Sequence, residues 1–240
     1  MYETLKTILP HNFLKRNEPL FRKIVYRFYK GATRQCPICE KKLRKFILLK
    51  NGETLCPFCG SLPRHRRLWT LISPFLQNGI SVLDFSPPLS FYKKIKSFKE
   101  IQYKATDFEK EFTADLNLDI TNINLSSNSI DLILCYHILE HIPEDKKAIG
   151  ELYRILKSPG KCFIQTPFKE GDIYEDLSKQ SKVEKRLHFG QDDHVRIYSL
   201  QSLKERLEDA GFKTEVLQFS ENEENYFGFS TKETVLKATK

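Results

Sequence analysis

The sequence predicts an α/β fold, namely a doubly wound, seven-stranded and mostly parallel sheet with a small N-terminal module built on four cysteines. Two observations predict it. From residue 80 onward, short apolar strand-like segments alternate with amphipathic helix-like ones, which is typical of a parallel sheet with helices on both faces. Ahead of them, two Cys-x2-Cys pairs stand close together. We therefore divide the chain into residues 1–35, 36–60 and 61–240.

Charge and hydropathy limit the class of protein. Residues 1–70 hold 16 Lys and Arg against 4 Asp and Glu, whereas the remainder holds 23 against 27. Such a basic third either meets an anionic partner or forms a solvated basic face. The longest nearly apolar stretch, LWTLISPFL, is too short to span a bilayer, and the N-terminus lacks the features of a signal peptide. We expect a cytoplasmic location, with peripheral membrane contact as an open alternative.

Residues 1–35 contain a basic amphipathic helix. In EPLFRKIVYRFYKG the apolar residues recur at helical spacing with Arg and Lys between them. Packing of this stripe onto a neighbouring domain is the favoured interpretation, and adsorption to an anionic membrane surface is the alternative.

Residues 36–60 carry the strongest local motif. Cys36 and Cys39 are followed, after sixteen residues, by Cys56 and Cys59, which is the spacing of a zinc ribbon with four thiolate ligands. The segment between the pairs predicts a hairpin with Asn51-Gly52 at its tip. A disulfide framework is unusual in a cytosolic chain. Because four sulfur ligands leave no position for water, the expected Zn²⁺ is structural.

A helix opens the third region with an unusual first turn. SLPRHRRLWTLISPFL places Arg64, His65, Arg66 and Arg67 where cations oppose the helix dipole. Either an anionic ligand or acidic side chains of the protein could compensate them, and the sequence leaves this choice open.

The alternation from residue 80 follows a simple order. Strands are expected at ISVLDF, IQYKATD, ADLNLDI, SIDLILCYH, GKCFIQTP, KTEVLQF and ETVLKATK, and helices at LSFYKKIKSF, PEDKKAIGELYRILK and SLQSLKERLEDAGF. Asp84, Asp107, Asp119 and His137 fall at or just past strand ends, where ligands of doubly wound sheets bind. A polar insertion at about 168–193 is expected to act as a substrate lid.

These parts resemble a known family. LDITNINLSSNSIDLILCYHILEHI, followed by ELYRILKSPGKCFIQTP, is similar to the central part of class I S-adenosylmethionine-dependent methyltransferases, which have a Rossmann-like sheet. The fuller pattern combines the four cysteines with C-G-S-x-x-R-H-R, V-L-x-F-x-P and F-G-Q-x-D-H-V-R-x-Y. It resembles an uncharacterised bacterial group of zinc-ribbon methyltransferases.

The resemblance implies an S-adenosylmethionine site at the strand ends. Asp107 matches the carboxylate that holds the ribose hydroxyls, and Asp119 matches the residue beside the adenine. Their alternatives are a solvated turn aspartate and the cap of a turn. The implied cofactor-binding residues are Asp84, Phe85, Ser86, Asp107, Asp119, Ile120 and Tyr136.

The turn after the first strand of this domain departs from the family pattern. Glycines normally let the cofactor approach the backbone, but Ser86, Pro87 and Pro88 stand here, and both prolines lack an N–H. We interpret the turn as an alternative cofactor loop in which the Ser86 hydroxyl and N–H replace the missing donors. A non-binding relic and an ordinary turn are the alternatives.

The catalytic candidates are His137, His194 and Asp193. His137 lies beside the expected position of the transferred methyl group, and an Asp193–His194 pair could act as a base near neutral pH. Alternatively, the H-x-R-x-Y motif at residues 194–198 only anchors the lid, and no single base exists.

Three functions follow from these motifs. The favoured one is transfer of a methyl group to a hydroxyl or amine of a small molecule or glycan precursor. An RNA methyltransferase that holds phosphates with the basic zinc module is a second function, and nucleic acid is the less favoured partner. A non-catalytic binding module on the same fold is the third.

Overall fold

The structure is a computed structural model that describes residues 11–108, 114–221 and 224–240. It forms two compact units. The cysteine unit comprises the described residues up to Phe75 together with Ser220–Glu233, and the sheet unit comprises Leu76–Phe219 and Thr234–Lys240. The connection between the last two strands therefore belongs to the cysteine unit, although it lies far from the cysteines in sequence.

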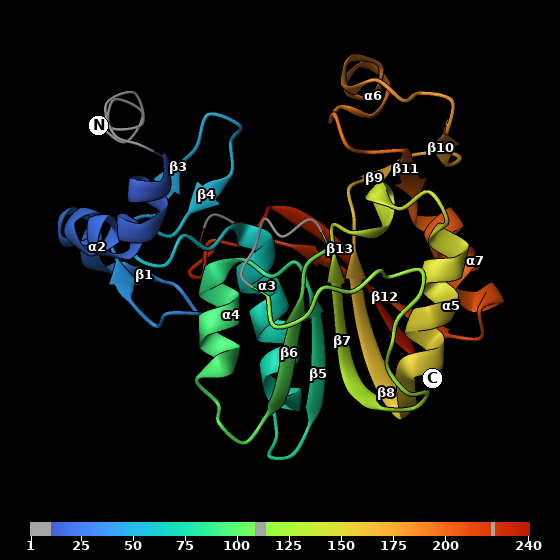
Figure 1. The fold of residues 1–240 in the computed structure, drawn as a ribbon. Helices are drawn as coiled ribbons and strands as arrows, with labels where there is room; N and C mark the ends of the chain where they lie inside the picture. Colours follow the sequence, from blue (N-terminus) through green and yellow to red (C-terminus); the bar gives the residue numbers. More distant parts are fainter. Residues whose placement is uncertain (1–10, 109–113, 222–223) are drawn as a thin grey trace. The chain divides into compact units, whose positions relative to one another are not determined.

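The sheet unit contains a six-stranded sheet of order β12-β13-β8-β7-β5-β6. β5 pairs in parallel with β6 and β7, β7 pairs in parallel with β8, and β13 runs antiparallel to β8. This order confirms the predicted doubly wound, mostly parallel fold (Figure 1). The strands are β5 (Ser81–Phe85), β6 (Gln102–Thr106), β7 (Ile130–Tyr136), β8 (Leu156–Gln165), β12 (Lys213–Ser220) and β13 (Lys232–Thr239).

The sheet has one strand fewer than the sequence predicts. The expected third strand, ADLNLDI, is reduced in the described residues to a single parallel bridge between Leu116 and Thr106. Its cause is local, because the Ala105 N–H of β6 donates to the Asp115 carboxylate at 2.9 Å. A side chain thus occupies the donor that a neighbouring strand would use for a ladder.

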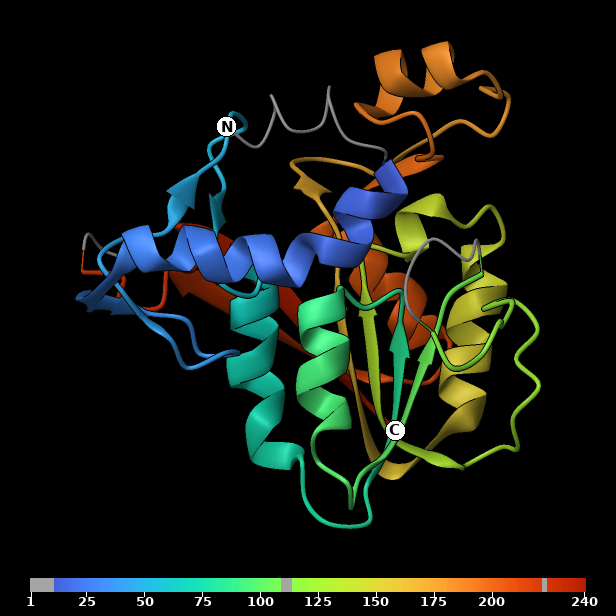
Figure 2. The same ribbon diagram turned by 60° about the vertical axis from the view of Figure 1, so that its left-hand side comes forward.

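Helices cover both faces of the sheet (Figures 1 and 2). The core face toward α5 (Asp145–Ile155) and α7 (Leu200–Asp209) contains Leu83, Ile133 and Cys135 with apolar residues of both helices. Because side chains alternate along strands, Val82 and Leu134 point to the opposite face. That face is covered by α4 (Leu89–Lys96), whose buried residues are Phe91 and Ile95.

The predicted lid is an ordered insertion. Two of its short strands pair with β11. β10 runs antiparallel to β11, and β9 runs parallel to it. Figure 1 shows these strands and α6 beyond the end of the sheet toward which β7 points. The elements are β9 (Phe168–Lys169), β10 (Tyr174–Glu175), α6 (Lys182–Phe189) and β11 (Arg196–Ser199).

The cysteine unit consists of short strands and helices. β3 and β4 form the predicted hairpin, with Gly52 at its tip at a φ of 84°. Among the described residues, none of the helices combines the length and apolar character needed to cross a bilayer. The elements are α2 (His11–Tyr29), β1 (Lys30–Gln35), β2 (Lys42–Leu43), β3 (Ile47–Leu48), β4 (Thr54–Leu55), α3 (Pro63–Ile72) and the 3-10 helix η1 (Ser73–Phe75).

The apolar stripe of α2 is divided between two environments. Tyr26 packs edge-on against Phe58, with ring centroids 5.3 Å apart, and its hydroxyl donates to the Lys42 carbonyl. Leu20 and Phe28, by contrast, are exposed. Packing therefore explains only part of the amphipathic pattern.

Candidate active site and metal centre

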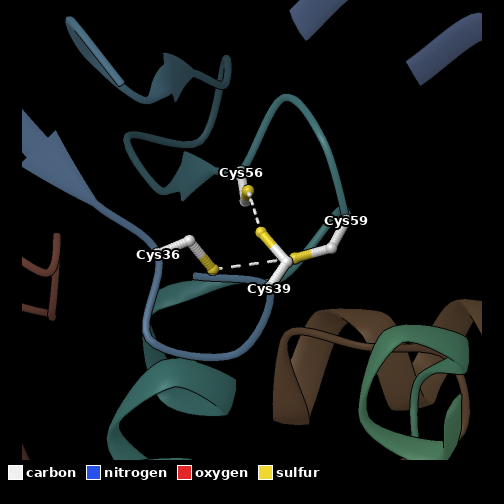
Figure 3. A group of neighbouring side chains, drawn as sticks. All are labelled: Cys36, Cys39, Cys56 and Cys59. Carbon is white, nitrogen blue, oxygen red and sulfur yellow. Dashed lines mark hydrogen bonds between the residues drawn. The ribbon is translucent and has the colours of Figure 1, made fainter. Parts of the chain in front are cut away.

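The four cysteines of the predicted ribbon converge on one point (Figure 3). The sulfurs of Cys36 and Cys59 lie 3.7 Å apart, as do those of Cys39 and Cys56. All four sulfurs lie within 4.8 Å of one another. Zn–S bonds of about 2.3 Å in a tetrahedron place sulfurs about 3.8 Å apart, whereas a disulfide needs about 2.05 Å. The arrangement is therefore compatible with a four-thiolate zinc centre.

Two equivalent backbone turns aim the sulfurs. The N–H of Glu40 donates to the Cys36 carbonyl and the N–H of Gly60 to the Cys56 carbonyl, at 2.8 and 2.9 Å. Glu40 and Gly60 have positive φ values of 61° and 76°. Glycine adopts this conformation at no steric cost. The Ser61 hydroxyl lies 3.3 Å from the sulfurs of Cys36 and Cys59 and adds an outer-shell contact of the kind that orients metal ligands.

The arginines in the first turn of α3 bind partners within the cysteine unit. Arg64 pairs with Glu53 at 2.9 Å. The fully buried Arg66 donates to the carbonyls of Ser61, Thr54 and Gly228. Arg67 pairs with Glu221 and lies 3.6 Å from Glu233. Acidic side chains and carbonyls of the protein thus compensate these cations, which answers the question that the sequence left open.

Asp84 of β5 is buried on the α4 face of the sheet. Its Oδ2 accepts a hydrogen bond of 2.9 Å from the Tyr103 hydroxyl. Burial raises the pKa of Asp84 to about 8, although the Tyr103 hydrogen bond opposes the shift. This predicted cofactor residue, like the buried Phe85 next to it, lies in the core.

We expect the stability of the sheet unit to depend on the ionisation of Asp84. Its carboxyl ionises near pH 4 in the unfolded chain but near pH 8 in the folded one. Ionisation therefore favours unfolding, and stability falls as the pH rises from about 4 to about 8. Asp84→Asn, which cannot ionise, should become progressively more stable than the unmodified protein across this range.

The measurement is urea unfolding followed by circular dichroism at pH 5 and pH 8. Asp131→Asn is the control, because Asp131 pairs with Lys157 at 2.8 Å. Desolvation disfavours the Asp131 carboxylate, but Lys157 and Ser81 outweigh this effect and hold the pKa of Asp131 below its ordinary value. Its loss should destabilise the protein at neutral pH. A constant difference between Asp84→Asn and the unmodified protein would contradict the expectation.

The turn after β5 brings two predicted cofactor residues together. Ser86 has a φ of 50°, in the left-handed region where glycine would normally stand. Its hydroxyl donates to Asp107 Oδ1 at 3.0 Å, and its N–H donates to the Thr106 carbonyl at 2.7 Å. Both donors that the sequence assigned to the cofactor are therefore engaged within the protein. The turn positions the buried Asp107 carboxylate.

The predicted adenine-side residues occupy different environments. Asp119 is exposed and accepts hydrogen bonds from the N–H and hydroxyl of Thr121, at 2.8 and 2.7 Å, which lower its pKa. Ile120 is buried in the core and Tyr136 is partly buried at the end of β7. Asp119 thus caps a turn, and its contact with the adenine stays a prediction.

Unpaired buried polar atoms gather where the parallel strands end. Within the described residues, they include Thr106 Oγ1 at the end of β6, His137 Nε2 after β7, and Gln165 Oε1 with Thr166 Oγ1 after β8. Ser90 Oγ, in the first turn of α4, belongs to the same group. Buried polar atoms are normally hydrogen-bonded, so this edge of the sheet has the donors and acceptors of a site for a polar ligand.

Histidines and carboxylates form a cluster just past β7. His137, whose φ is 55°, places Nδ1 3.2 Å from Oε1 of the buried Glu140. The rings of His141 and His194 meet edge-on, with centroids 4.6 Å apart. The Nδ1 of His141 lies 3.2 Å from Asp193 Oδ2. Asp193 therefore pairs with His141, whereas the sequence suggested a pair with His194.

Burial and neighbouring charge set the ionisation of the cluster. Burial, with His141 nearby, lowers the pKa of His194, so its imidazole is neutral at pH 7. Burial also disfavours the Glu140 carboxylate, but His137 and His141 outweigh this effect and hold the pKa of Glu140 below its ordinary value. At neutral pH the cluster thus combines an ionised buried carboxylate with a neutral imidazole.

Comparison with known proteins decides the family. A family model described as a methyltransferase domain matches residues 64–217, more than half of the chain. The chain belongs to this methyltransferase family. A curated relative, uncharacterized protein MJ0638 of Methanocaldococcus jannaschii, is 34% identical over 65 residues, which are 27% of this chain and 28% of that protein. The match thus spans little more than a quarter of the relative's length.

Solved structures agree with the family at the level of fold. A SAM-dependent methyltransferase from Archaeoglobus fulgidus is 16% identical, with a TM-score of 0.51 over 75% of this chain and 95% of that one. Phosphoethanolamine N-methyltransferase 2 of Haemonchus contortus, in complex with S-adenosyl-L-methionine, is 17% identical, with a TM-score of 0.52 over 74% and 52%. Both structures share the fold of this chain's methyltransferase domain.

In this methyltransferase, a buried arginine holds the turn that carries Glu140 and His141. Arg196 is fully buried and donates to the carbonyls of Leu139, Ile142 and Pro143. Its Nε also donates to Glu175 at 2.9 Å. These bonds fix the 3-10 helix η2 (Leu139–His141) against β11. The H-x-R-x-Y motif therefore anchors the turn after β7, beyond any role in the lid.

Sequence reasoning did not assign a role to Glu140 or Arg196 of this methyltransferase. Glu140 lies within the segment LDITNINLSSNSIDLILCYHILEHI that resembles the family, but that resemblance gave it no role. Its position three residues after His137 and one before His141 is a spacing that could have drawn attention, because side chains one turn apart lie on the same side of a helix. Arg196 is the arginine of the H-x-R-x-Y motif at residues 194–198, but its burial depends on contacts with residues more than fifty positions away.

Proposed function

We propose that the protein transfers a methyl group from S-adenosylmethionine to a hydroxyl or amine of a small molecule or glycan precursor. The observation that carries this proposal is the gathering of unpaired buried polar atoms at the ends of β6, β7 and β8, beside the His137–Glu140 contact. Ligands of doubly wound sheets bind at this edge.

The residues present fit the cofactor on its ribose side. Asp107 directly follows β6 and is buried, and the Ser86 hydroxyl donates to one of its carboxylate oxygens at 3.0 Å. A carboxylate so oriented can accept hydrogen bonds from both hydroxyls of a ribose. S-adenosylmethionine supplies an electrophilic methyl carbon on a sulfonium, and the chain's part is to orient the acceptor and exclude water. Pro87 and Pro88 offer no N–H to the methionine part, so the ribose contact should dominate affinity.

The acceptor should enter from the side of the insertion. β9, β10, β11 and α6 lie beyond the end of the sheet toward which β7 points (Figure 1), and Leu177, Val183 and Leu187 of the insertion are exposed. Exposed apolar side chains on this insertion favour an acceptor with an apolar body and one reactive hydroxyl or amine. His137 is the candidate nearest the methyl position that can receive the acceptor's proton.

The contacts of the α3 arginines support this proposal over an RNA methyltransferase. Arg64, Arg66 and Arg67 were its candidate phosphate ligands, but each is bound to carboxylates or carbonyls of the cysteine unit. From the remaining basic charge of that unit we expect only weak and sequence-independent attraction to polyanions.

The test is calorimetric titration with S-adenosylmethionine. Asp107→Ala should weaken binding by about 10- to 100-fold, because charge-assisted hydrogen bonds contribute about 1.5–3 kcal/mol each and 1.4 kcal/mol is a factor of ten. Asp209→Ala, which removes an exposed carboxylate at the end of α7, should bind as the unmodified protein does.

A second arm looks for the product. Cell extract incubated with the protein and methyl-labelled cofactor should yield a compound heavier by one labelled methyl, found by mass spectrometry. Unmodified protein that binds the cofactor no better than Asp107→Ala would refute the proposed function and favour a binding module on this fold.

A further inference from the structure

A second group of potential metal ligands lies outside the four cysteines. One carboxylate oxygen of Glu140 and one ring nitrogen each of His141 and His194 lie within 4.8 Å of one another. Metal–ligand bonds of about 2.0–2.2 Å place neighbouring ligand atoms roughly 3–4 Å apart, so a small inward movement of these side chains suffices. Apart from the cysteines, this is the only such group that the described residues contain.

The environment of the Glu140 carboxylate favours the binding of a cation. Its side chain is 1% exposed, and within the described part of the chain neither carboxylate oxygen has a hydrogen-bond partner. His137 Nδ1 approaches Oε1 to 3.2 Å without the alignment of a hydrogen bond. Buried carboxylate oxygens without aligned donors are costly. His137 and His141 favour the charged form of Glu140, and a bound cation would add the direct ligand contact that no aligned donor in the described residues supplies.

The surroundings of His141 resemble the outer shell of a metal site. Its Nδ1 lies 3.2 Å from Asp193 Oδ2, which leaves Nε2 as the nitrogen available to a metal. Histidine ligands characteristically donate their other N–H to a carboxylate in this way. The rings of His141 and His194 are perpendicular, with an interplanar angle of 89°, so their nitrogens can point to a common centre without stacking. Arg196 fixes the turn beneath them.

We propose that Glu140, His141 and His194 bind a second divalent cation of the transition series, distinct from the zinc expected at the cysteines. Two imidazoles with one carboxylate suit Zn²⁺, Mn²⁺, Fe²⁺ or Co²⁺ better than Ca²⁺ or Mg²⁺, which prefer oxygen ligands alone. Three protein ligands leave at least one coordination position open.

The open position defines a class of acceptor. The group adjoins His137, and on the proposed function the acceptor lies there, so a hydroxyl or carboxylate oxygen of the acceptor completes the coordination. This part of the inference rests on the proposed function, whereas the metal site does not. It narrows the acceptor to a molecule with an oxygen donor at or beside the methylated atom.

The experiment is a titration of the 240-residue chain, loaded with one equivalent of zinc, with Mn²⁺. Binding is followed by the electron paramagnetic resonance signal of the free ion. One further equivalent should bind. Asp193→Asn removes an outer-shell partner and should weaken Mn²⁺ binding by about 10- to 100-fold. Glu140→Gln has a side chain of equal size but removes a ligand, so it should weaken Mn²⁺ binding by at least as much.

His188→Asn is the matched control, because His188 lies outside the group and its Nδ1 is 2.6 Å from the Tyr174 hydroxyl. It should bind Mn²⁺ normally, and all variants should retain one zinc per chain. Glu140→Gln binding as tightly as the unmodified protein overturns the proposal. So does failure of Mn²⁺, Co²⁺ and Zn²⁺, each tried separately, to bind beyond the first zinc equivalent. Second-cation binding without cofactor binding sustains the metal site and refutes the proposed function.

Discussion

Cys56→Ser should abolish stoichiometric zinc binding and unfold the cysteine unit. Structural zinc in small modules contributes about 10–16 kcal/mol of apparent binding free energy, and removing one of four ligands forfeits most of it. The unit has two-residue strands in its hairpin, and besides its cysteines and prolines only six apolar side chains are buried in its described residues. We expect one zinc per unmodified chain and far less than one in the variant.

Trp69 makes this unfolding visible. It is the single tryptophan of the chain, it is buried, and it lies on α3 in the cysteine unit. Its fluorescence should shift to longer wavelength in Cys56→Ser, and likewise when a chelator removes zinc from the unmodified protein. None of the four cysteines belongs to the sheet unit. That unit should stay folded, so the variant should retain most of the far-ultraviolet circular dichroism signal.

Cys135→Ala provides the matched control. Cys135 is as fully buried as Cys56 but belongs to the core of the sheet unit. Its replacement should leave zinc content and Trp69 emission unchanged. A Cys56→Ser protein with normal zinc and unshifted emission would contradict the assignment of the four cysteines as one centre.

Local chemistry made the cysteine centre predictable, whereas its setting was not. The spacing of Cys36, Cys39, Cys56 and Cys59 encodes two turns whose geometry depends on adjacent residues alone. The carbonyl of Gly228 that receives Arg66 lies 162 residues away from it. No periodicity relates these positions, so the sequence could not show that the β12–β13 connection completes the cysteine unit.

The sheet shows the same division. Strand and helix periodicity predicted the order of elements, because burial on one face imposes a repeat on neighbouring residues. The prediction of a third strand at ADLNLDI was wrong for a reason that periodicity cannot detect, because the Asp115 carboxylate accepts the hydrogen bond of the Ala105 N–H. Likewise, Ser86 and Asp107 could be placed at strand ends, but the hydrogen bond between them could not.

Arg196→Met should be the most destabilising single substitution in the sheet unit. The guanidinium is fully buried and holds three carbonyls of the turn at residues 139–143 together with Glu175. Leaving a buried acceptor without its donor costs about 1–3 kcal/mol, and Arg196→Met removes this donor from three carbonyls, so we expect a loss of about 3–5 kcal/mol. Glu175 keeps its hydrogen bond from Arg206. At about 2–4 °C per kcal/mol, the melting temperature should fall by roughly 6–20 °C.

Hydrogen exchange localises the effect. The Val195 N–H donates to the Glu140 carbonyl and the His141 N–H to that of Ile138, and both should lose protection in Arg196→Met. Arg186→Met is the control, because Arg186 is 70% exposed and pairs only with Asp192 on the surface. It should change stability by no more than about 0.5 kcal/mol.

The same variant connects stability to the proposed second cation. Glu140 and His141 lie on the turn that Arg196 holds, so Arg196→Met should also weaken Mn²⁺ binding, although Arg196 contributes no ligand. The cysteine centre should keep its zinc, because its residues belong to the other unit. Unchanged melting and unchanged exchange in residues 138–142 would show that the turn is held by its own backbone, and that the buried arginine is not the element that positions the cluster.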